Sequence, residues 1–542
     1  MRNALIIFLN LLSLIITAQY DSIFNSYFNN PNAPGAVAAV GNADSVFFQK
    51  AYGLANLDSS EKITQNTLFE IASNSKQFTC FGLMLLEQEG KIYWEDDIRK
   101  YIPEMPFYGD TIRLKHCAHH TSGIKDYVAL MHLAGWRQDS IVTFGETLNL
   151  IFNLSEPNFK PGEKYEYSNS GYALLAEIIN RVTDEGFVAF MENKVFKAAK
   201  LESATIRTEL KPIKNEATPY YFPSTAVKES RNLSQAYGAS AILMNINDAI
   251  KWMQFVINPP EEYKALIQKM TSREEFNDKK HFHYKYGFYL KTYRDLDVVA
   301  HAGQWYGFTS VFRYFPKDSL FTIVMNNGNY EDRMWEWTEV VSDFYLGLES
   351  RNSGWNKSDK HKTVERTPDE MKKFEGEFII KRAGHVKIFI KNNQLFGIDP
   401  FGDEYPLYHL GNNVFKWDSE EITAKFKKGA LKYYFVKVGP LKIKARPYDD
   451  SKIKGLNHLD LKGSYYNKDL NVTYQVKIED CKLVLHHKSH GTIPIKQRNK
   501  STFNVGKWWM YEIHFIKEKG KITGFKMTGI ARNYGELTFN KL

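Results

Sequence analysis

Cysteine is scarce in this sequence: the 542 residues include three, at positions 80, 117 and 481. An odd and widely spaced set of thiols does not form the disulfide framework of a small secreted domain. We therefore interpret Cys80, Cys117 and Cys481 as buried, inert thiols, with a Cys80–Cys117 bridge as the alternative. The hydrophobic fraction of 43% is that of a globular protein, and the length predicts two to four domains.

Long apolar runs are also missing. The apolar stretch at residues 4–16 is shorter than the roughly 20 residues that a membrane-spanning helix needs. Arg2 precedes it, and Thr17-Ala18 before Gln19 fits a cleavage site. We interpret residues 1–18 as a secretory signal, with an uncleaved anchor as the alternative. The expected protein is exported, periplasmic or secreted, with no transmembrane segment in its mature form.

Clustered charge of one sign is absent too. The net charge of +9 is spread along the chain and does not form the basic stripe of a nucleic-acid-binding protein. The spacing of His116, His119 and His120 fits no helical i, i+4 ligand pair with a nearby acid, and no acid or cysteine completes a metal-binding set with His486, His487 and His490. We interpret the first group as bracing a turn and the second as a solvated loop. We expect no cofactor and no metal.

The first chemical signal lies at Ser73 and Lys76. Apolar residues at helical spacing from Phe78 onward, with Gly90 as a stop, predict a helix that begins near Ser73. Residues three apart share one face of a helix, so both side chains should point the same way. A serine becomes a nucleophile when a base lies within hydrogen-bond reach, and a lysine with a lowered pKa can be that base. A helix cap followed by a solvated lysine is the alternative.

Two further stretches favour the nucleophile and base over the helix cap and solvated lysine. Tyr167 and Asn169 are two residues apart before an apolar helix, so their side chains can point into the same space. A tyrosine near lysines can exchange protons, and an asparagine amide can orient a substrate carbonyl. His301 and Gly303 follow a predicted strand, where we place His301 at a strand edge beside a cleft. Gly303 allows the backbone to approach closely.

These pairs occur together in one order: Ser73-x-x-Lys76, Tyr167-x-Asn169 and His301-x-Gly303. Taken with their distances, they resemble the motif set of the serine β-lactamase and penicillin-binding-protein superfamily. The similarity covers roughly residues 20–350 and is to the class C β-lactamase-like branch. That branch includes D-alanyl-D-alanine carboxypeptidases, D-aminopeptidases and esterases.

The resemblance implies an α+β fold, in which helices flank an antiparallel sheet and a helical subdomain closes a cleft. It implies that Ser73 is acylated, and that Lys76 and Tyr167 share the base and acid roles. The implied substrate-binding residues are Asn169, His301, Gly303 and Gln304, with the oxyanion held by the backbone N–H groups of Ser73 and Gln304. His301 stands where many relatives carry lysine, which favours an esterase or aminopeptidase over an antibiotic-degrading lactamase.

The rest of the chain alternates polar and apolar residues. We expect a signal at 1–18, a hydrolase domain at 19–350, a polar linker at 351–367, and two all-β repeats at 368–452 and 457–542. The segment around Gly376 is echoed around Gly463. These repeats resemble the small lipocalin-like barrels appended to D-aminopeptidase-type serine hydrolases.

The sequence therefore predicts an exported serine hydrolase that forms a covalent acyl-enzyme at Ser73. Its substrate would be a small molecule or short peptide: a D-amino-acid peptide, an ester or a β-lactam-like compound, peptidoglycan-derived ones included. The alternative is a penicillin-binding or cell-wall-binding protein without turnover, whose hydrolase domain is vestigial. No nucleic-acid partner is expected, and the oligomeric state stays open.

Overall fold

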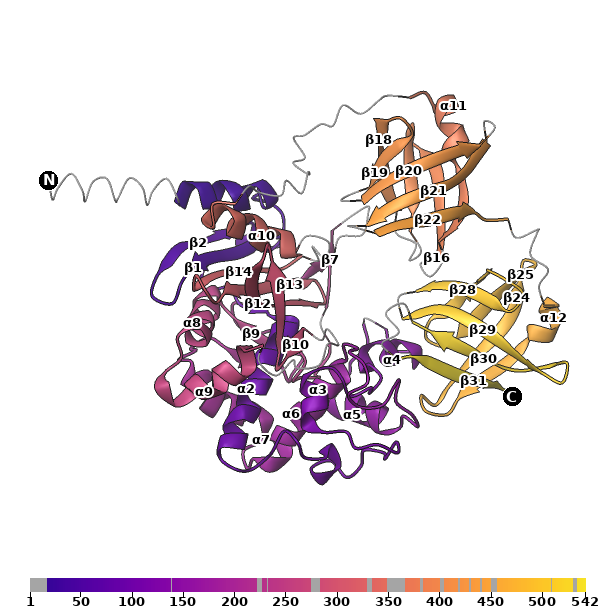
Figure 1. Ribbon diagram of the computed structural model, residues 1–542. Helices are drawn as coiled ribbons and strands as arrows, with labels where there is room; N and C mark the ends of the chain where they lie inside the picture. Colours follow the sequence, from indigo (N-terminus) through magenta and orange to yellow (C-terminus); the bar gives the residue numbers. More distant parts are fainter. Residues whose placement is uncertain are drawn as a thin grey trace. The chain divides into compact units, whose positions relative to one another are not determined.

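The chain forms two compact units in the computed structural model (Figure 1). The described residues are 17–137, 139–221, 227–231, 233–273, 283–328, 334–348, 366–380, 384–399, 404–417, 420–427, 430–438, 441–449, 456–507, 509–529 and 534–542. The first unit contains the described residues of 17–124 and 139–348, and the second contains those of 125–137 and 366–542. The predicted signal, 1–18, and the predicted linker, 351–367, lie almost wholly outside the described residues and stay predictions.

A seven-stranded antiparallel sheet forms the centre of the first unit. Its strands are ordered β10-β11-β12-β13-β14-β1-β2. Their bounds are Ala36–Gly41 (β1), Val46–Tyr52 (β2), Tyr284–Lys285 (β10), Phe288–Tyr293 (β11), Leu296–Trp305 (β12), Phe308–Phe315 (β13) and Leu320–Asn326 (β14). Every residue of β1, β13 and β14 is buried, because helices cover both faces of the sheet.

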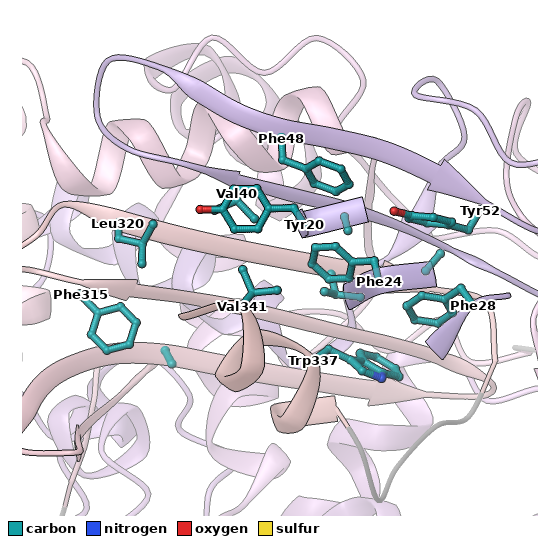
Figure 2. Close-up of a cluster of buried hydrophobic side chains, with 14 of the residues drawn as sticks. Tyr20, Phe24, Phe28, Val40, Phe48, Tyr52, Phe315, Leu320, Trp337 and Val341 are labelled. Carbon is teal, nitrogen blue, oxygen red and sulfur yellow. The ribbon is translucent and has the colours of Figure 1, made fainter. Parts of the chain in front are cut away.

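One face of the sheet is covered by two helices, at residues 17–27 and at α10 (Met334–Tyr345). Figure 2 shows their aromatic side chains packed onto the strands. Phe24 of the first helix stacks on Phe48 of β2, with ring centroids 5.5 Å apart, and Trp337 of α10 is buried in the same cluster. Burying side chains of this size contributes about 1.5–3 kcal/mol each, so this cluster ties the start of the described chain to the sheet.

The other helices of the first unit belong to the opposite face and to a helical region. They are α2 (Ser75–Gln88), α3 (Leu114–Ala118), α5 (Phe144–Phe152), α6 (Asn169–Val182), α7 (Gly186–Phe190), a π-helical turn at Met191–Phe196, α8 (Ile246–Ile257) and α9 (Glu261–Thr271). Helix α2 contacts α6 and α9 and is buried on nearly every side. A helix buried all round is a core element, and α2 is the helix predicted to follow Ser73.

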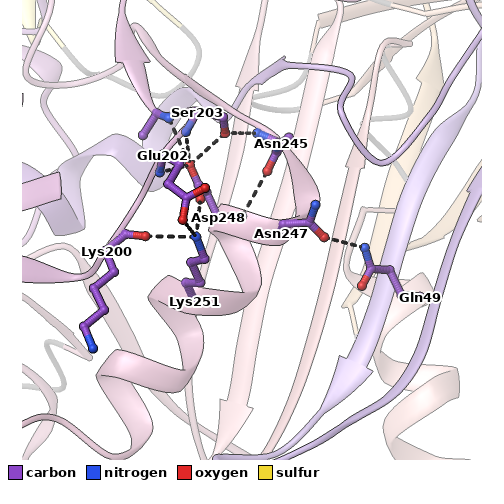
Figure 3. Close-up of polar contacts among 9 residues, drawn as sticks. Gln49, Lys200, Glu202, Ser203, Asn245, Asn247, Asp248 and Lys251 are labelled. Carbon is purple, nitrogen blue, oxygen red and sulfur yellow. Dashed lines mark hydrogen bonds and ion pairs between the residues drawn. The ribbon is translucent and has the colours of Figure 1, made fainter. Parts of the chain in front are cut away.

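A small second sheet delivers the chain to Ser73. It is ordered β5-β9-β6, with bounds Phe69–Glu70, Ile242–Met244 and Thr205–Ile206. Figure 3 shows the polar group that anchors it, centred on Asp248 at the start of α8. The Asp248 carboxylate accepts hydrogen bonds from the backbone N–H groups of Glu202 and Ala204, at 2.9 and 3.0 Å. The turn before β6 is thereby fixed to α8.

The second unit is all-β apart from short helical segments, which confirms the predicted fold class. Strands β15 to β22 form a closed barrel: Gly376–Ile380, Gly384–Lys391, Gln394–Ile398, Glu404–Gly411, Val414–Trp417, Glu420–Lys427, Ala430–Val438 and Leu441–Pro447. Strands β23 to β31 form a nine-stranded antiparallel sheet: Gly463–Asn467, Val472–Glu479, Lys482–His487, Gly491–Pro494, Lys496–Gln497, Thr502–Lys507, Met510–Glu518, Lys521–Thr528 and Glu536–Lys541.

The two β structures begin in the same way. A short helix comes first in each, α11 (Pro368–Met371) or α12 (His458–Leu461). A glycine with left-handed backbone follows, Gly376 with φ of 149° and Gly463 with φ of 147°. This matched geometry supports a repeat. Buried aromatic rings lie in both interiors, such as Tyr434 in the first and Phe525 in the second.

Residues 125–137 pack with the second repeat, which no sequence pattern predicted. They include α4 (Tyr127–Leu133), whose Leu133 carbonyl accepts a hydrogen bond from the Tyr474 hydroxyl at 2.9 Å. The ring Nε2 of His490 lies 2.7 Å from the carbonyl oxygen of His132. His487 is 1% exposed. The interpretation of this histidine group as a solvated loop was therefore wrong for His487.

Candidate active site

Ser73 lies in a strained turn rather than inside the helix. A 3₁₀ turn, Ala72–Asn74, precedes α2, so the predicted helix begins two residues later than Ser73. Ala72 has φ of 48°, a left-handed conformation that costs a non-glycine residue about 1–2 kcal/mol. The Ser310 hydroxyl donates to the Ile71 carbonyl at 2.7 Å and accepts from the Asn74 side-chain amide at 2.8 Å. These bonds hold the turn in its strained shape.

Lys76 lies about one helical turn after Ser73 along the chain, as the spacing predicts. Its Nζ is 3.0 Å from Ser73 Oγ, 2.9 Å from Asn169 Oδ1 and 2.8 Å from the Ala239 carbonyl oxygen. Two of these atoms are carbonyl oxygens, which only accept. Two N–H bonds of Lys76 therefore point at them, and the remaining position faces the serine. A neutral amine held this way presents its lone pair to the Ser73 hydroxyl, and an ammonium presents a proton.

Tyr167 and Asn169 meet at the same lysine, in agreement with their predicted proximity. Lys76 Nζ lies 5.0 Å from the centre of the Tyr167 ring. Asn169 is the first residue of α6, and its side-chain oxygen accepts from Lys76. Ser73, Tyr167 and Asn169 are partly exposed, whereas Lys76 is fully buried. A substrate can therefore touch the first three side chains while the Lys76 side chain stays shielded behind them.

Gly303 approaches Ser73 as closely as predicted. A Cβ at position 303 would lie 2.2 Å from the Ile71 carbonyl oxygen and 2.8 Å from the Ser73 nitrogen, so only glycine fits. Strand β12 thus passes beside the backbone N–H of Ser73. Gln304, which is half-buried, is the next residue of the same strand.

His301 differs from its predicted place. It lies within β12, between β11 and β13, and its side chain is 1% exposed rather than at a strand edge beside a cleft. Its Nδ1 lies 2.6 Å from the Ala302 carbonyl oxygen, so Nδ1 donates, and Nε2 accepts from the Tyr284 hydroxyl at 2.9 Å. Burial, with the nearby charge of Lys76, lowers the pKa of His301 to about 3. The ring is neutral and fully engaged, so its geometry does not support the predicted contact with substrate.

Two residues near Tyr167 and Lys76 escaped the sequence reasoning. His120 was interpreted as a brace for a turn, and it also packs on Tyr167, with ring centroids 4.0 Å apart. Ala239 belongs to the small-residue loop at 237–241, and its carbonyl accepts from Lys76. The run of small residues is the signal that could have marked this loop, since small side chains let a backbone carbonyl approach a buried lysine.

Cys80 lies beside this cluster, with its Sγ 3.5 Å from the Tyr172 hydroxyl. All three cysteines are free thiols: Cys80 and Cys117 are buried, as predicted, whereas Cys481 is exposed, which corrects that part of the prediction. Burial raises the pKa of the Cys80 and Cys117 thiols to about 12, so both stay protonated and unreactive.

Comparisons with known proteins agree with this fold. The sequence model of the Beta-lactamase family matches residues 21–341, more than half of the chain, and the chain belongs to this family. This confirms the resemblance that the three motifs indicated.

Three relatives illustrate the similarity. Protein flp of Staphylococcus aureus (strain MRSA252) is 29% identical over 324 residues, which cover 58% of this chain and 63% of flp, less than two thirds of that protein. The octameric penicillin-binding protein homologue from Pyrococcus abyssi has a TM-score of 0.57 at 18% identity, over 79% of this chain and 99% of that one. The D-amino acid amidase from Ochrobactrum anthropi SV3 has a TM-score of 0.52 at 20% identity, over 61% and 99%.

Proposed function

We propose that this protein is an exported serine hydrolase that works through an acyl-enzyme on Ser73. The observation that carries the proposal is the buried Lys76 Nζ, 3.0 Å from Ser73 Oγ. In the first step the Ser73 proton passes to Lys76 or Tyr167 while Oγ bonds to the substrate carbonyl carbon. The backbone N–H groups of Ser73 and Gln304 hold the oxyanion, and the leaving group departs with the proton. Water then attacks the ester, and Ser73 regains its proton.

The proposed substrates are esters and amides without a carboxylate at the His301 end of the site, D-aminoacyl amides among them. A neutral imidazole with both nitrogens engaged offers no charge and no free donor to a carboxylate. One solved structure of similar fold is a D-amino acid amidase complexed with D-phenylalanine, which makes a D-aminoacyl amide the natural first compound to try.

The test is incubation of the mature protein with p-nitrophenyl acetate, D-alanine p-nitroanilide and, separately, a fluorescent penicillin, followed by intact mass. We expect turnover of the ester or the D-amide, and no lasting penicillin adduct. Ser73→Ala is the control and should abolish turnover and labelling. A lingering penicillin adduct at Ser73 without turnover would favour the penicillin-binding alternative. If none of the three compounds reacts with the protein, the hydrolase proposal is overturned.

Export is the second part of the proposal. Cleavage after Ala18 would leave Tyr20, Phe24 and Phe28 in the mature chain, and all three are buried in the core of the first unit. Cleavage beyond residue 20 would remove one of these core aromatic rings. N-terminal sequencing of the protein recovered outside the cytoplasm should therefore give Gln19 first. Recovery of the uncleaved chain in the cytoplasm would contradict export.

A further inference from the structure

His120 holds the backbone on both sides of Tyr167. Its carbonyl oxygen accepts the N–H of Glu166 at 2.9 Å, and its ring Nδ1 accepts the N–H of Ser168 at 3.1 Å. Both bonds come from this one residue, and His120 has φ of 57°, a left-handed backbone that histidine tolerates better than most residues. The two residues that flank the proposed acid–base tyrosine are thus clamped by a single side chain and its own carbonyl.

The ring of His120 also sets the plane of Tyr167. The two rings are 4.0 Å apart between centroids with an interplanar angle of 36°. Tyr284, the partner of His301, packs on the other rings of this cluster and lies 4.4 Å from His120. His120 is 1% exposed, so this contact excludes water from one side of Tyr167.

The clamp requires neutral histidine. A backbone N–H can only donate, so Nδ1 must carry the lone pair and the ring proton must be on Nε2. Nε2 has no hydrogen-bond partner among the described residues, so Ser168 is the one described hydrogen-bond partner of the ring. Burial, with the charge of Lys76, holds the pKa of His120 well below its ordinary value. The titratable groups that face the ring are Lys76 from α2, Tyr165, Tyr167, Tyr172 from α6, Tyr284 from β10, His301 from β12, and the adjacent His119.

We propose that His120 is a positioning residue for Tyr167, which fixes both the backbone beside Tyr167 and the plane of its ring for proton transfer at Ser73. The inference rests on the proposed function. Misplacing a proton-transfer group by about 1 Å can reduce a rate about 100-fold without changing how substrate binds. Loss of the clamp should therefore lower kcat and leave KM nearly unchanged.

Two substitutions, each made in the full mature chain, separate the hydrogen bond to Ser168 from the ring contact with Tyr167. His120→Phe keeps the ring on Tyr167 and removes the acceptor for Ser168. His120→Asn keeps an acceptor and tolerates left-handed backbone, and it removes the ring. We expect each to lower the rate of Ser73 acetylation by p-nitrophenyl acetate by about 10- to 100-fold, with KM within about threefold of the unsubstituted protein. His119→Asn is the matched control, because that ring packs on Tyr286 instead, and it should stay within about twofold.

The outcomes separate this inference from the proposed function. If the unsubstituted protein is acetylated at Ser73 and both His120 variants react within twofold of it, only the positioning role is overturned. If kcat and KM change equally in the His120 and His119 variants, the effect is general damage and the role is also overturned. Absence of acetylation in the unsubstituted protein would overturn the proposed function and this inference with it. If His120→Phe does not fold, the rate of His120→Asn decides the matter.

Discussion

The two units bury different kinds of side chain. Around Ser73 the first unit buries polar and charged groups that have hydrogen-bond partners, including Glu70, Asn74, Lys76 and His120. The barrel-forming repeats of the second unit are filled mainly by aliphatic and aromatic side chains. Buried polar groups cost free energy unless they are paired, so a protein keeps them where chemistry needs them. The comparison places the candidate catalytic cluster among buried polar groups of the first unit, whereas the described interiors of the repeats are mainly apolar.

The largest expected effect is that of Ser73→Ala. It should abolish acylation completely, because it removes the hydroxyl that lies 3.0 Å from Lys76 Nζ, and it removes only one partly exposed oxygen. The thermal midpoint should change by no more than about 2 °C, since the effect on unfolding free energy is small. Intact mass after p-nitrophenyl acetate checks the labelling. Persistent labelling would identify a different nucleophile.

Tyr167→Phe should come next in size. It keeps the ring that packs on His120 and removes the hydroxyl proposed for proton transfer. Loss of a general acid–base group lowers a rate by about 100- to 10,000-fold. Single-turnover acylation measures this directly, with Tyr165→Phe as the neighbouring control. Equal rates for Tyr167→Phe and the unsubstituted protein would remove Tyr167 from the mechanism.

Phe525→Ala tests the apolar interior of the second unit. Phe525 is fully buried, and its ring lies 4.9 Å from those of both Tyr465 and Phe539. Truncating such a ring should lower the free energy of unfolding of the second unit by about 3–5 kcal/mol. Acylation of Ser73 should be unchanged at temperatures where the variant is folded. Denaturant unfolding and the acylation rate, measured on one sample, would expose any dependence of the site on this core.

Acidification should weaken the second unit by a smaller amount. Burial lowers the pKa of His132 and His487 to about 4. An unfolded chain takes up these protons near pH 6.5, so it binds more protons than the folded one between pH 6.5 and 4. The free energy of unfolding should therefore fall as the pH drops from 7 to 5, by on the order of 1–2 kcal/mol for each histidine. His487→Gln should flatten the dependence, and an unfolding midpoint independent of pH would contradict it.

Tyr434→Phe should have the smallest effect. The Tyr434 hydroxyl donates to the Phe374 carbonyl at 2.6 Å inside the first barrel. Removing one such bond should cost about 1 kcal/mol of unfolding free energy, with a larger loss if the carbonyl is left without a partner. The unfolding midpoint gives the value. A loss of acylation in this variant would show that the Ser73 site depends on the packing of the second unit.

Much of the first unit could be predicted from the sequence because its signals are local. The spacing of Ser73 and Lys76 places both on one side of a helical turn, and the spacing of Tyr167 and Asn169 brings both to one lysine. Gly303 was predicted to permit close backbone approach, and the close contact with Ser73 is there. In the second unit, alternating residues indicated strands and repeats, which is what period-2 patterns report.

The sequence misled where partners come from distant segments. His301 was placed at a strand edge beside a cleft, yet it is buried between β11 and β13, and the hydroxyl of Tyr284, 17 residues earlier in the chain, lies 2.9 Å from its Nε2. His487 was interpreted as part of a solvated loop, yet it is 1% exposed and packs against residues 125–137, where a Cβ on Gly135 would lie 2.3 Å from its ring. Contacts of this kind, between segments far apart in the chain, produce no periodic pattern in the sequence.

By itself, then, the sequence determined the motif set, the family resemblance and the all-β nature of the C-terminal region, because each depends on residue types at short separations. Only the tertiary structure decided which groups surround Tyr167. His120 is 47 residues from Tyr167 along the chain by number, and the left-handed turn that brings them together is stabilised by bonds to Glu166 and Ser168. The tautomer and burial of His301 were decided in the same way, by neighbours that only the folded chain supplies.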